Sequence, residues 1–279
     1  MEKLNALEKE VSIVYLAAGI SSRFGGKVKQ FEKVGPNGET LIEVSMNHAV
    51  SAGVSEIIFI VGDKTELIFK EKFGDDYKGT PVKYAKQFFN PDARDRPWGT
   101  ADALISAKNV IKNSFLICNG DDLYGENSFK RMKDFMSKSK DDFLCASAGY
   151  ELGNVIPAIG EVNRAVYSLD NQGYISGLDE RFNIEKNSLE KQGLNSKTLV
   201  SMNLFGLTLK TIELLEENLV NFKKSHLGDR KIECFLPVEL SNLIKENKIK
   251  MKLLPTSDKW LGITNPGDEL TVRNALAKK

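Results

Sequence analysis

Residues 11–30 read Val-Ser-Ile-Val-Tyr-Leu-Ala-Ala-Gly-Ile-Ser-Ser-Arg-Phe-Gly-Gly-Lys-Val-Lys-Gln, an apolar segment that runs into a turn of small residues and then into cations. Small residues let backbone N–H groups approach a polyphosphate closely, and cations add charge that backbone dipoles cannot supply. The small residues are Ala17, Ala18, Gly19, Ser21 and Ser22, and the cations are Arg23, Lys27 and Lys29. The stretch predicts a phosphate-binding loop; the alternative is a glycine-rich turn with a solvated cationic rim.

Two common phosphate-binding loops do not fit this spacing. A P-loop has a glycine five residues before its Gly-Lys pair and a Ser or Thr after it. Here Ser21 stands five residues before Gly26, and Val28 follows Lys27. The dinucleotide pattern Gly-x-Gly-x-x-Gly also fails, because Ser21 stands two residues after Gly19. The loop therefore belongs to neither class.

A second motif lies at residues 115–125, Phe-Leu-Ile-Cys-Asn-Gly-Asp-Asp-Leu-Tyr-Gly. An apolar strand ends at Gly120 and is followed by two carboxylates, which suits a hard divalent cation such as Mg²⁺ or Mn²⁺ bound together with substrate phosphates. Asp121 is the preferred ligand, with Asp122 in support. The alternative is a turn in which an Asp caps the following helix.

The composition excludes several classes of protein. The 279 residues include 39 Lys and Arg against 38 Asp and Glu, scattered along the chain, so no overall field favours nucleic acid or an anionic membrane. The amino-terminal residues do not resemble a signal peptide, and no apolar run is long enough to span a membrane. Cys118, Cys145 and Cys234 are widely spaced. We therefore expect a cytoplasmic protein with buried, reduced thiols.

Apolar patterning alternates between strand and helix over the first half of the chain. Strands are predicted at 12–16, 56–61, 82–86 and 114–119, and helices near 41–52, near 64–73 and after Thr100. This alternation favours an α/β fold with a doubly wound, mostly parallel sheet, in which ligands bind at the carboxyl ends of the strands.

The second half has a less regular pattern. Strands are predicted at 143–149, 164–169, 173–178, 199–207 and 249–254, and helices near 208–220, 235–246 and 266–277. We expect a single domain over residues 1–279. In it, residues from about 11 to 142 form a nucleotide-binding half, and those from about 143 to 279 add a smaller sheet that holds the second substrate.

The loop sequence Leu-Ala-Ala-Gly-x-x-x-Arg at residues 16–23, followed by Lys29, resembles the signature of the sugar-1-phosphate nucleotidylyltransferases. The resemblance extends from about residue 11 to 277 and implies the nucleotide-diphospho-sugar transferase fold. It implies that Arg23 neutralises the leaving pyrophosphate and Lys29 the α-phosphate. It also implies that the nucleotide contacts Leu16, Ala17, Ala18, Gly19, Ser21 and Ser22. Ser21 stands where the family usually has Gly, so a loop of slightly different length is expected.

The resemblance also assigns the metal site. In the family's Gly-Asp-(Asn/Asp) element the first Asp binds the metal, which corresponds to Asp121. The segment from Trp260 to Asp268 resembles a later element that supplies a second ligating Asp, but Gly262 stands at that position. The second ligand is therefore open between Thr264, Asn265 and Asp258.

Base recognition is expected around residues 97–104, Pro-Trp-Gly-Thr-Ala-Asp-Ala-Leu, which resemble the family's Gly-Thr-Ala-x-Ala element. By that resemblance Gly99 and Thr100 contact a pyrimidine edge. Gly99 allows close backbone approach, and Thr100 offers a hydroxyl and a helix N-cap, a role that alone would explain it. Gln87 is a further candidate, because its amide can both donate and accept hydrogen bonds.

Sugar recognition is expected in the second half, where three segments resemble sugar-contacting elements of a bacterial branch of the family. They are Gly160-Glu-Val-Asn-Arg, Leu178-Asp-Glu-Arg-Phe-Asn-Ile-Glu-Lys and Val200-Ser-Met-Asn-Leu-Phe-Gly. The resemblance implies that Glu180 accepts from sugar hydroxyls, Arg181 meets the sugar phosphate, Asn203 contacts a ring substituent and Gly160 lies at the sugar. Arg suits a phosphate because its planar fork can bind two oxygens.

These observations predict an enzyme that transfers a nucleotidyl group from a pyrimidine nucleoside triphosphate to a sugar 1-phosphate with the help of Mg²⁺ or Mn²⁺. Its partners are then small molecules, with no nucleic acid or membrane, and a homo-oligomer is compatible with the sequence. One alternative is a cytidylyltransferase that acts on phosphocholine or another phospho-alcohol. Another is a regulatory module that binds nucleotide sugars without catalysis, which Gly262 favours.

Overall fold

The apolar segment before the phosphate loop forms β1 (Val11–Leu16), the centre of the sheet in the computed structural model. The structure describes residues 8–19, 28–157, 160–263 and 267–277. β1 pairs in parallel with β2 (Ile57–Val61) on one side and β5 (Ser114–Asn119) on the other. All three strands are almost wholly buried, because helices cover both faces of the sheet.

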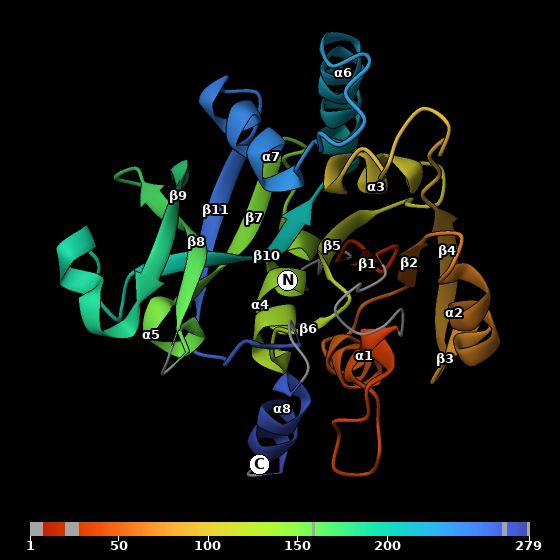
Figure 1. The fold of residues 1–279 in the computed structure, drawn as a ribbon, viewed down its shortest axis with the longest axis horizontal. Coiled ribbons are helices and arrows are strands. Elements are labelled where there is room, and N and C mark those ends of the chain that lie inside the picture. Colours follow the sequence, from red (N-terminus) through yellow and green to blue (C-terminus); the bar gives the residue numbers. More distant parts are fainter. Residues whose placement is uncertain (1–7, 20–27, 158–159, 264–266, 278–279) are drawn as a thin grey trace, which may run out of the picture.

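Strands from both halves of the chain share this sheet. β10 (Leu199–Leu207) pairs antiparallel with β5 and with β7 (Leu144–Glu151), and β11 (Lys250–Thr256) pairs in parallel with β7. At the other edge, β4 (Thr80–Lys86) follows β2, and the short β3 (Asp76–Tyr77) pairs with β4. The described strands therefore run in the order β11-β7-β10-β5-β1-β2-β4-β3, and the predicted α/β class is confirmed (Figure 1).

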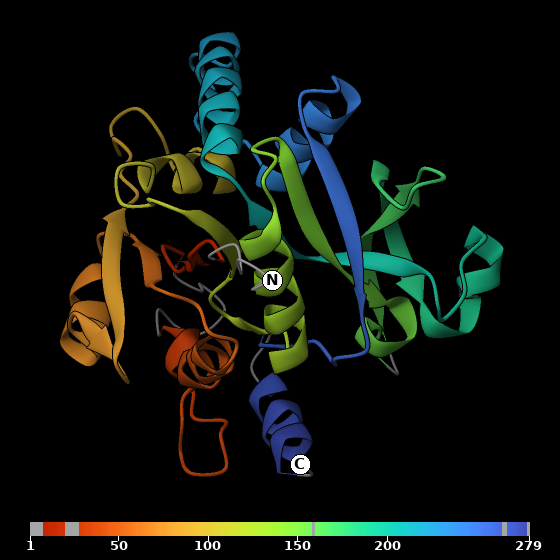
Figure 2. The same ribbon diagram turned by 180° about the vertical axis from the view of Figure 1, so that it is seen from behind.

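Two layers of helices cover the sheet (Figure 1, and from behind in Figure 2). One layer holds α1 (Leu41–Ser51), α2 (Glu66–Phe73) and α4 (Glu126–Lys138), and the other holds α3 (Thr100–Ser106), α6 (Leu209–Ser225) and α7 (Leu236–Lys245). The side chains of β1 alternate between them: Ile13 packs in the core under the first layer and Val14 in the core under the second. The sequence analysis did not predict α4.

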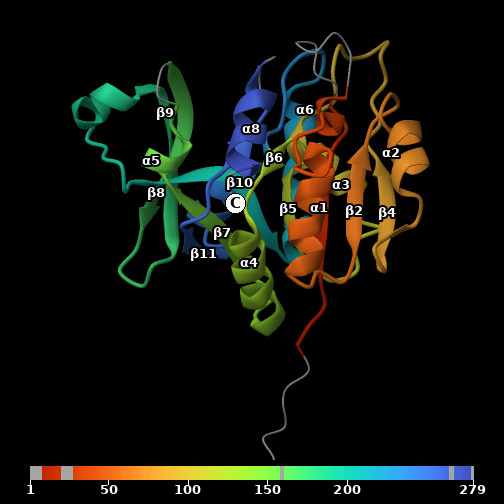
Figure 3. The ribbon, with the colours of Figure 1, turned by 90° about the horizontal axis from the view of Figure 1, so that it is seen from below.

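The β8–β9 hairpin extends from the sheet at the side of β10. β8 (Glu161–Leu169) and β9 (Ile175–Glu185) pair antiparallel, and Val166 of β8 pairs with Val200 of β10. The short helices α5 (Leu152–Val155) and η3 (Lys186–Gln192) flank the hairpin. Figure 3 shows the hairpin at one side of the molecule, with α8 (Asp268–Leu276) between it and α1.

A small second sheet joins the end of the chain to the carboxylate motif. β6 (Asp122–Leu123) pairs antiparallel with β12 (Leu261–Gly262), so that Asp122 lies opposite Gly262. Leu123, Ile263 and Val272 of α8 share a buried cluster with Leu41 of α1. This cluster, together with the hydrogen bond from the Ile263 N–H to the Asp121 carbonyl, fixes residues 260–263 beside Asp121.

The three cysteines are buried and unpaired, as expected from the sequence. Among the described residues, no helix combines the length and the apolar character needed to cross a membrane.

Candidate active site

The start of the phosphate loop lies between two glycines at the carboxyl ends of the strands that flank β1. A Cβ at Gly62 would lie 2.9 Å from the Ala18 carbonyl oxygen, and one at Gly120 would lie 3.0 Å from that of Leu16. Larger residues at either place would displace the loop backbone. Beside Gly19, no described atom lies within 4 Å of a built Cβ position, so the turn faces open space. Ser21, Ser22, Arg23 and Lys27 lie outside the described residues.

Lys29 and Asp121 meet at this end of the sheet. Lys29 opens the short helix η2 (Lys29–Phe31), and its Nζ forms an ion pair with Asp121 Oδ2. Lys29 Nζ also donates to the carbonyl oxygen of Ile263 at 3.1 Å. Both side chains remain partly exposed, at 18% and 24%. The structure thus brings together two of the three predicted catalytic residues, in a position open to a ligand.

Asp122 lies behind this ion pair and is buried. Its Oδ2 accepts from Asn119 Nδ2 at 2.9 Å and from the Tyr124 hydroxyl at 3.2 Å. Burial, and secondarily the charge of Asp121, raises the pKa of Asp122 to about 7. Asp122 is thus buried beside Asp121 in surroundings that disfavour a second negative charge.

Gly262 leaves no room for the carboxylate that the family places there. A Cβ at this position would lie 2.5 Å from Asp122 Oδ1 and 2.6 Å from the Trp260 ring. The space is filled from both sides, by Asp122 and by the indole of Trp260. An acidic residue at position 262 would require these side chains to move.

Of the open candidates for a second metal ligand, Asp258 is engaged at the start of α4. Its Oδ2 accepts from the Ser128 backbone N–H at 2.8 Å and from the Ser128 hydroxyl at 3.1 Å, and its Oδ1 accepts from Asn127. Asp258 thus caps α4 from a distant part of the chain, because the first turn of the helix has unsatisfied N–H groups and Gly125 has no side chain. The Asp pair after β5 does not cap that helix. Thr264 and Asn265 lie outside the described residues.

The acidic residues fit a cation that takes most of its ligands from elsewhere. Within the described part of the chain, no group of three or more His, Cys, Asp or Glu residues is arranged to hold a metal. Asp121 and Asp122 are adjacent carboxylates on one turn. This is the donor set of a Mg²⁺ ion that is held by one or two carboxylates together with substrate phosphates and water.

Gln87 is buried and its amide has a fixed orientation. Its Nε2 donates to the Gly99 carbonyl at 3.0 Å and to Asp102 Oδ2 at 2.9 Å. The other oxygen of Asp102 pairs with Lys223 Nζ of α6 at 2.5 Å. Because a carbonyl and a lysine-paired carboxylate only accept, the nitrogen of the amide must face them. The sequence analysis expected the Gln87 amide both to donate to a base and to accept from it. The structure corrects this, because the Nε2 donors are used by Gly99 and Asp102 and only the acceptor Oε1 is left for a ligand.

Gly99 approaches the backbone of Cys234 closely, whereas the close approach predicted for this glycine was to a pyrimidine base. Its φ is +98°, and a Cβ would lie 2.6 Å from the Cys234 carbonyl oxygen. The predicted N-cap role of Thr100 is wrong, because Gly99 occupies the cap position and Thr100 is the first residue of α3. Thr100 Oγ1 instead accepts from the backbone N–H of Leu236 at 2.9 Å. Its hydroxyl ties α3 to the start of α7.

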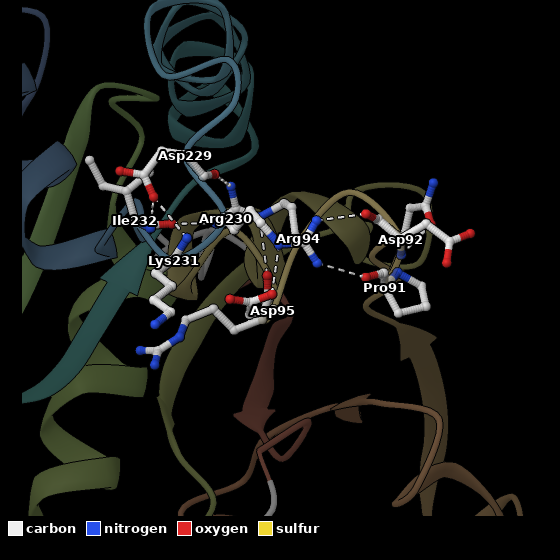
Figure 4. Close-up of polar contacts among 10 residues, drawn as sticks. Pro91, Asp92, Arg94, Asp95, Asp229, Arg230, Lys231 and Ile232 are labelled. Carbon is white, nitrogen blue, oxygen red and sulfur yellow. Dashed lines mark hydrogen bonds and ion pairs between the residues drawn. The ribbon is translucent and has the colours of Figure 1, made fainter.

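Two arginines join the loop before Gly99 to residues 229–232 (Figure 4). Arg94 is buried and donates to the carbonyl oxygens of Asp229 at 2.7 Å and Ile232 at 2.5 Å. Its guanidinium also stacks on Trp98, with 3.4 Å between the guanidinium carbon and the centroid of the ring. In the opposite direction, Arg230 donates to Asp95 at 2.8 Å and to backbone carbonyls of that loop. The two arginines hold the loop that carries the predicted base-binding residues.

The predicted sugar-binding residues lie on or beside the β8–β9 hairpin and the bulge of β10. Gly160 has a φ of +98° directly before β8, and Asn203 has a φ of +61° where the β10–β7 register shifts. Glu180 and Arg181 are exposed on β9. Burial raises the pKa of Glu180, and the charge of Arg164 opposes this.

Arg164 and Arg181 lie on one face of this hairpin. Their Cα atoms are partners in the β8–β9 register, and directly opposite residues of antiparallel strands share a face. Arg164 is half-buried and Arg181 exposed. The sequence analysis gave no role to Arg164, Asp102 or Lys223. Arg164 and Asp102 lie inside motifs that it quoted, but no sequence pattern places Lys223 beside Asp102.

Comparison with known proteins supports the resemblance seen in the sequence. Residues 25–154, just under half of the chain, match the family model described as Nucleotidyl transferase. One curated relative is the UTP–glucose-1-phosphate uridylyltransferase AglF of Haloferax volcanii, 27% identical over 131 residues, which is 46% of this chain and 49% of the relative. Another is the bifunctional protein GlmU of Methanocaldococcus jannaschii, 26% identical over 75% of this chain and 41% of the relative. The alignments thus span about half the length of these relatives or less.

Solved structures share the fold of this chain over nearly its whole length. The inositol-1-phosphate CTP transferase from T. maritima has a TM-score of 0.66 at 16% identity, with 96% of each chain covered. A putative glucose-1-phosphate thymidylyltransferase from Bacillus anthracis has a TM-score of 0.67 at 14% identity, covering 97% of this chain and 96% of that one. HddC from Yersinia pseudotuberculosis has a TM-score of 0.62 at 18% identity, covering 95% of this chain and 99% of that one. The fold expected from the sequence is confirmed.

Proposed function

We propose that this protein moves a nucleotidyl group from a pyrimidine nucleoside triphosphate to a sugar 1-phosphate, giving an NDP-sugar and pyrophosphate. The observation that carries the proposal is the Lys29–Asp121 pair beside the glycine-flanked turn at residues 17–19. This arrangement combines phosphate-binding backbone, a cation and a carboxylate at one point. A curated relative named as a glucose-1-phosphate uridylyltransferase supports the substrate class.

The reaction needs no nucleophile from the protein. An oxygen of the sugar phosphate, already ionised, attacks the α-phosphorus in line, and pyrophosphate leaves from the opposite side. Catalysis is then positioning and neutralisation of charge. Lys29 neutralises the α-phosphate, and Arg23, which lies outside the described residues, is assigned to the leaving pyrophosphate.

Asp121 would hold the divalent cation, with Asp122 in support. When bound, Mg²⁺ or Mn²⁺ supplies positive charge to the substrate phosphate oxygens. The Nζ of Lys29 pairs with Asp121 Oδ2 and donates to the carbonyl oxygen of Ile263, so these contacts fix the position of its charge beside the carboxylate.

Gln87 supports a keto pyrimidine as the base. Its donors are held by Gly99 and Asp102, and Oε1 is an acceptor. Uracil and thymine carry an imide N–H that can donate to this oxygen, whereas N3 of cytosine only accepts and its one donor on that edge is the exocyclic amine. The proposal therefore favours UTP or dTTP over CTP.

The test is pyrophosphate release by the full chain with Mg²⁺, each of five nucleoside triphosphates in turn, and a panel of phosphate esters. The panel contains several sugar 1-phosphates, inositol 1-phosphate and phosphocholine. Release with UTP or dTTP and a sugar 1-phosphate supports the proposal. Release with CTP and a phospho-alcohol replaces it with cytidylyl transfer, and triphosphate binding without any release replaces it with a regulatory role.

A further inference from the structure

Two buried N–H donors near Asp122 have no hydrogen-bond acceptor among the described residues. They are Arg164 Nε on β8 and Trp260 Nε1, just before β12. A buried donor without an acceptor is destabilising, because it has lost its hydrogen bonds to water, so native proteins rarely leave two together. Their presence at the junction of the two halves indicates a ligand that accepts hydrogen bonds.

The two side chains are neighbours. The guanidinium carbon of Arg164 lies 5.5 Å from the centroid of the Trp260 ring. Arg164 Nη1 donates to the Asn163 carbonyl at 2.8 Å, and Nη2 donates to that of Val155 at 3.1 Å. The outer end of the fork is thus anchored to backbone, which holds the group in place while its Nε remains available.

The pair lies beside the carboxylate turn. Trp260 ring atoms and Asp122 Oδ1 both come within 2.7 Å of the point where a Cβ of residue 262 would lie. The indole therefore reaches Asp122 only because residue 262 is glycine. The missing side chain of Gly262 leaves a space that the Trp260 ring occupies. This packing explains why glycine stands where the family pattern has a carboxylate.

Arg164 carries a positive charge that no described carboxylate neutralises by direct contact. It forms hydrogen bonds to carbonyls and no ion pair within the described residues. Burial lowers the pKa of Arg164, and the charges of Asp122 and Glu180 oppose this. A desolvated guanidinium with an open N–H binds oxyanions strongly, because hydrogen bonds between charged groups are about twice as strong as neutral ones.

We propose that Arg164 and Trp260 form the binding site for the phosphate group of the acceptor, a phosphate monoester. The inference rests on the proposed function for the identity of that ester as the second substrate. It moves the role that the family resemblance gave to Arg181 onto its cross-strand neighbour. In the proposed complex, Arg164 Nε and Trp260 Nε1, which are buried and have no acceptor among the described residues, donate to phosphate oxygens.

The kinetic test compares three Arg→Gln variants of the full chain. R164Q removes the proposed ligand, R181Q removes the residue favoured by the resemblance, and R131Q removes an exposed arginine of α4 outside the site as the matched control. We expect R164Q to raise KM for the acceptor about ten- to a hundredfold, with KM for the triphosphate nearly unchanged. R131Q should behave like the wild type. A larger acceptor effect in R181Q, or equal effects of R164Q on both substrates, overturns the proposal.

A second measurement does not depend on turnover. The chain has two tryptophans, Trp98 and Trp260, so incorporation of 5-fluorotryptophan gives two ¹⁹F signals, which W260F assigns. Titration with glucose 1-phosphate and with inorganic phosphate should shift the Trp260 signal in the wild type, with at least about tenfold weaker binding in R164Q. A shift caused by UTP alone would assign the site to the triphosphate and overturn the proposal, as would no shift at all.

The two measurements separate the inference from the proposed function. If no substrate pair releases pyrophosphate but phosphate esters shift the Trp260 signal through Arg164, the site stands and the reaction fails. If the wild type turns over and R164Q keeps its acceptor KM, the reaction stands and the site fails. R164K, which keeps the charge without the Nε fork, provides the comparison if R164Q does not fold.

Discussion

The two ends of the proposed site are held in different ways. At the nucleotide end, Lys29 pairs with Asp121, and Gln87 is fixed by Gly99 and Asp102. At the acceptor end, Glu180 and Arg181 extend from a hairpin and have no side-chain hydrogen bond among the described residues. The first end is preorganised by the protein's own contacts. The second leaves Glu180 and Arg181 without such contacts in the described part of the chain, whereas Arg164 is anchored there by two backbone carbonyls.

The largest effect is expected where the preorganised end meets the phosphates. K29M and D121N should each lower kcat about a hundred- to a thousandfold, because each removes a charge positioned for the transition state. The free energy of unfolding should fall by only about 1 kcal/mol, since partly exposed ion pairs contribute little. Initial rates and urea unfolding measure both. K112M, at an exposed lysine, is the control, and a kcat for D121N close to that of the wild type would contradict the comparison.

Arg94 tests whether the nucleotide end is fixed by its loop. R94M leaves the carbonyls of Asp229 and Ile232 without their donor and removes the stack on Trp98. We expect it to lower the free energy of unfolding by about 2–3 kcal/mol and to raise KM for the triphosphate more than KM for the acceptor. R230M is the matched control, since its side chain is 44% exposed and its loss should cost about 1 kcal/mol.

The loop does not position the base site if R94M and R230M lower the free energy of unfolding equally. The same conclusion follows if R94M raises KM for the acceptor but not KM for the triphosphate. Urea unfolding followed by circular dichroism, and substrate titrations at a fixed concentration of the other substrate, provide these values.

Gly262 tests the boundary between the two ends. G262A places a methyl group 2.5 Å from Asp122 Oδ1 and 2.6 Å from Trp260, so both must shift. Overpacking of this kind costs about 1–3 kcal/mol, and G262D should cost more rather than restore a metal ligand. If G262D keeps its stability and gains affinity for Mn²⁺, position 262 has room for a ligand and the Trp260 packing does not decide the site. Thermal unfolding and Mn²⁺ titration distinguish the two outcomes.

The same contrast explains what the sequence could predict. Apolar patterning predicts the strands at 114–119 and 199–207. The shared carboxyl edge of parallel strands explains why Lys29 and Asp121 meet. The role of Arg164 did not follow, because it depends on the β8–β9 register and on Gly262, which is distant in sequence. The Thr100 cap failed for a similar reason: the hydroxyl bonds to Leu236, a contact between distant segments that no local pattern encodes.

The smallest effect concerns the choice of base. In D102N, the introduced amide nitrogen competes for the position beside Gln87 Nε2, and the amide of Gln87 loses its preference for a single orientation. The ratio of kcat/KM for the preferred keto pyrimidine to that for CTP should then fall about three- to tenfold, a change of roughly 1 kcal/mol. K223M is the control, because it keeps the Asp102 oxygen that orients Gln87 and should keep the ratio. If D102N lowers kcat/KM for both triphosphates in parallel, Asp102 serves packing alone, and the fixed orientation of Gln87 does not select the base.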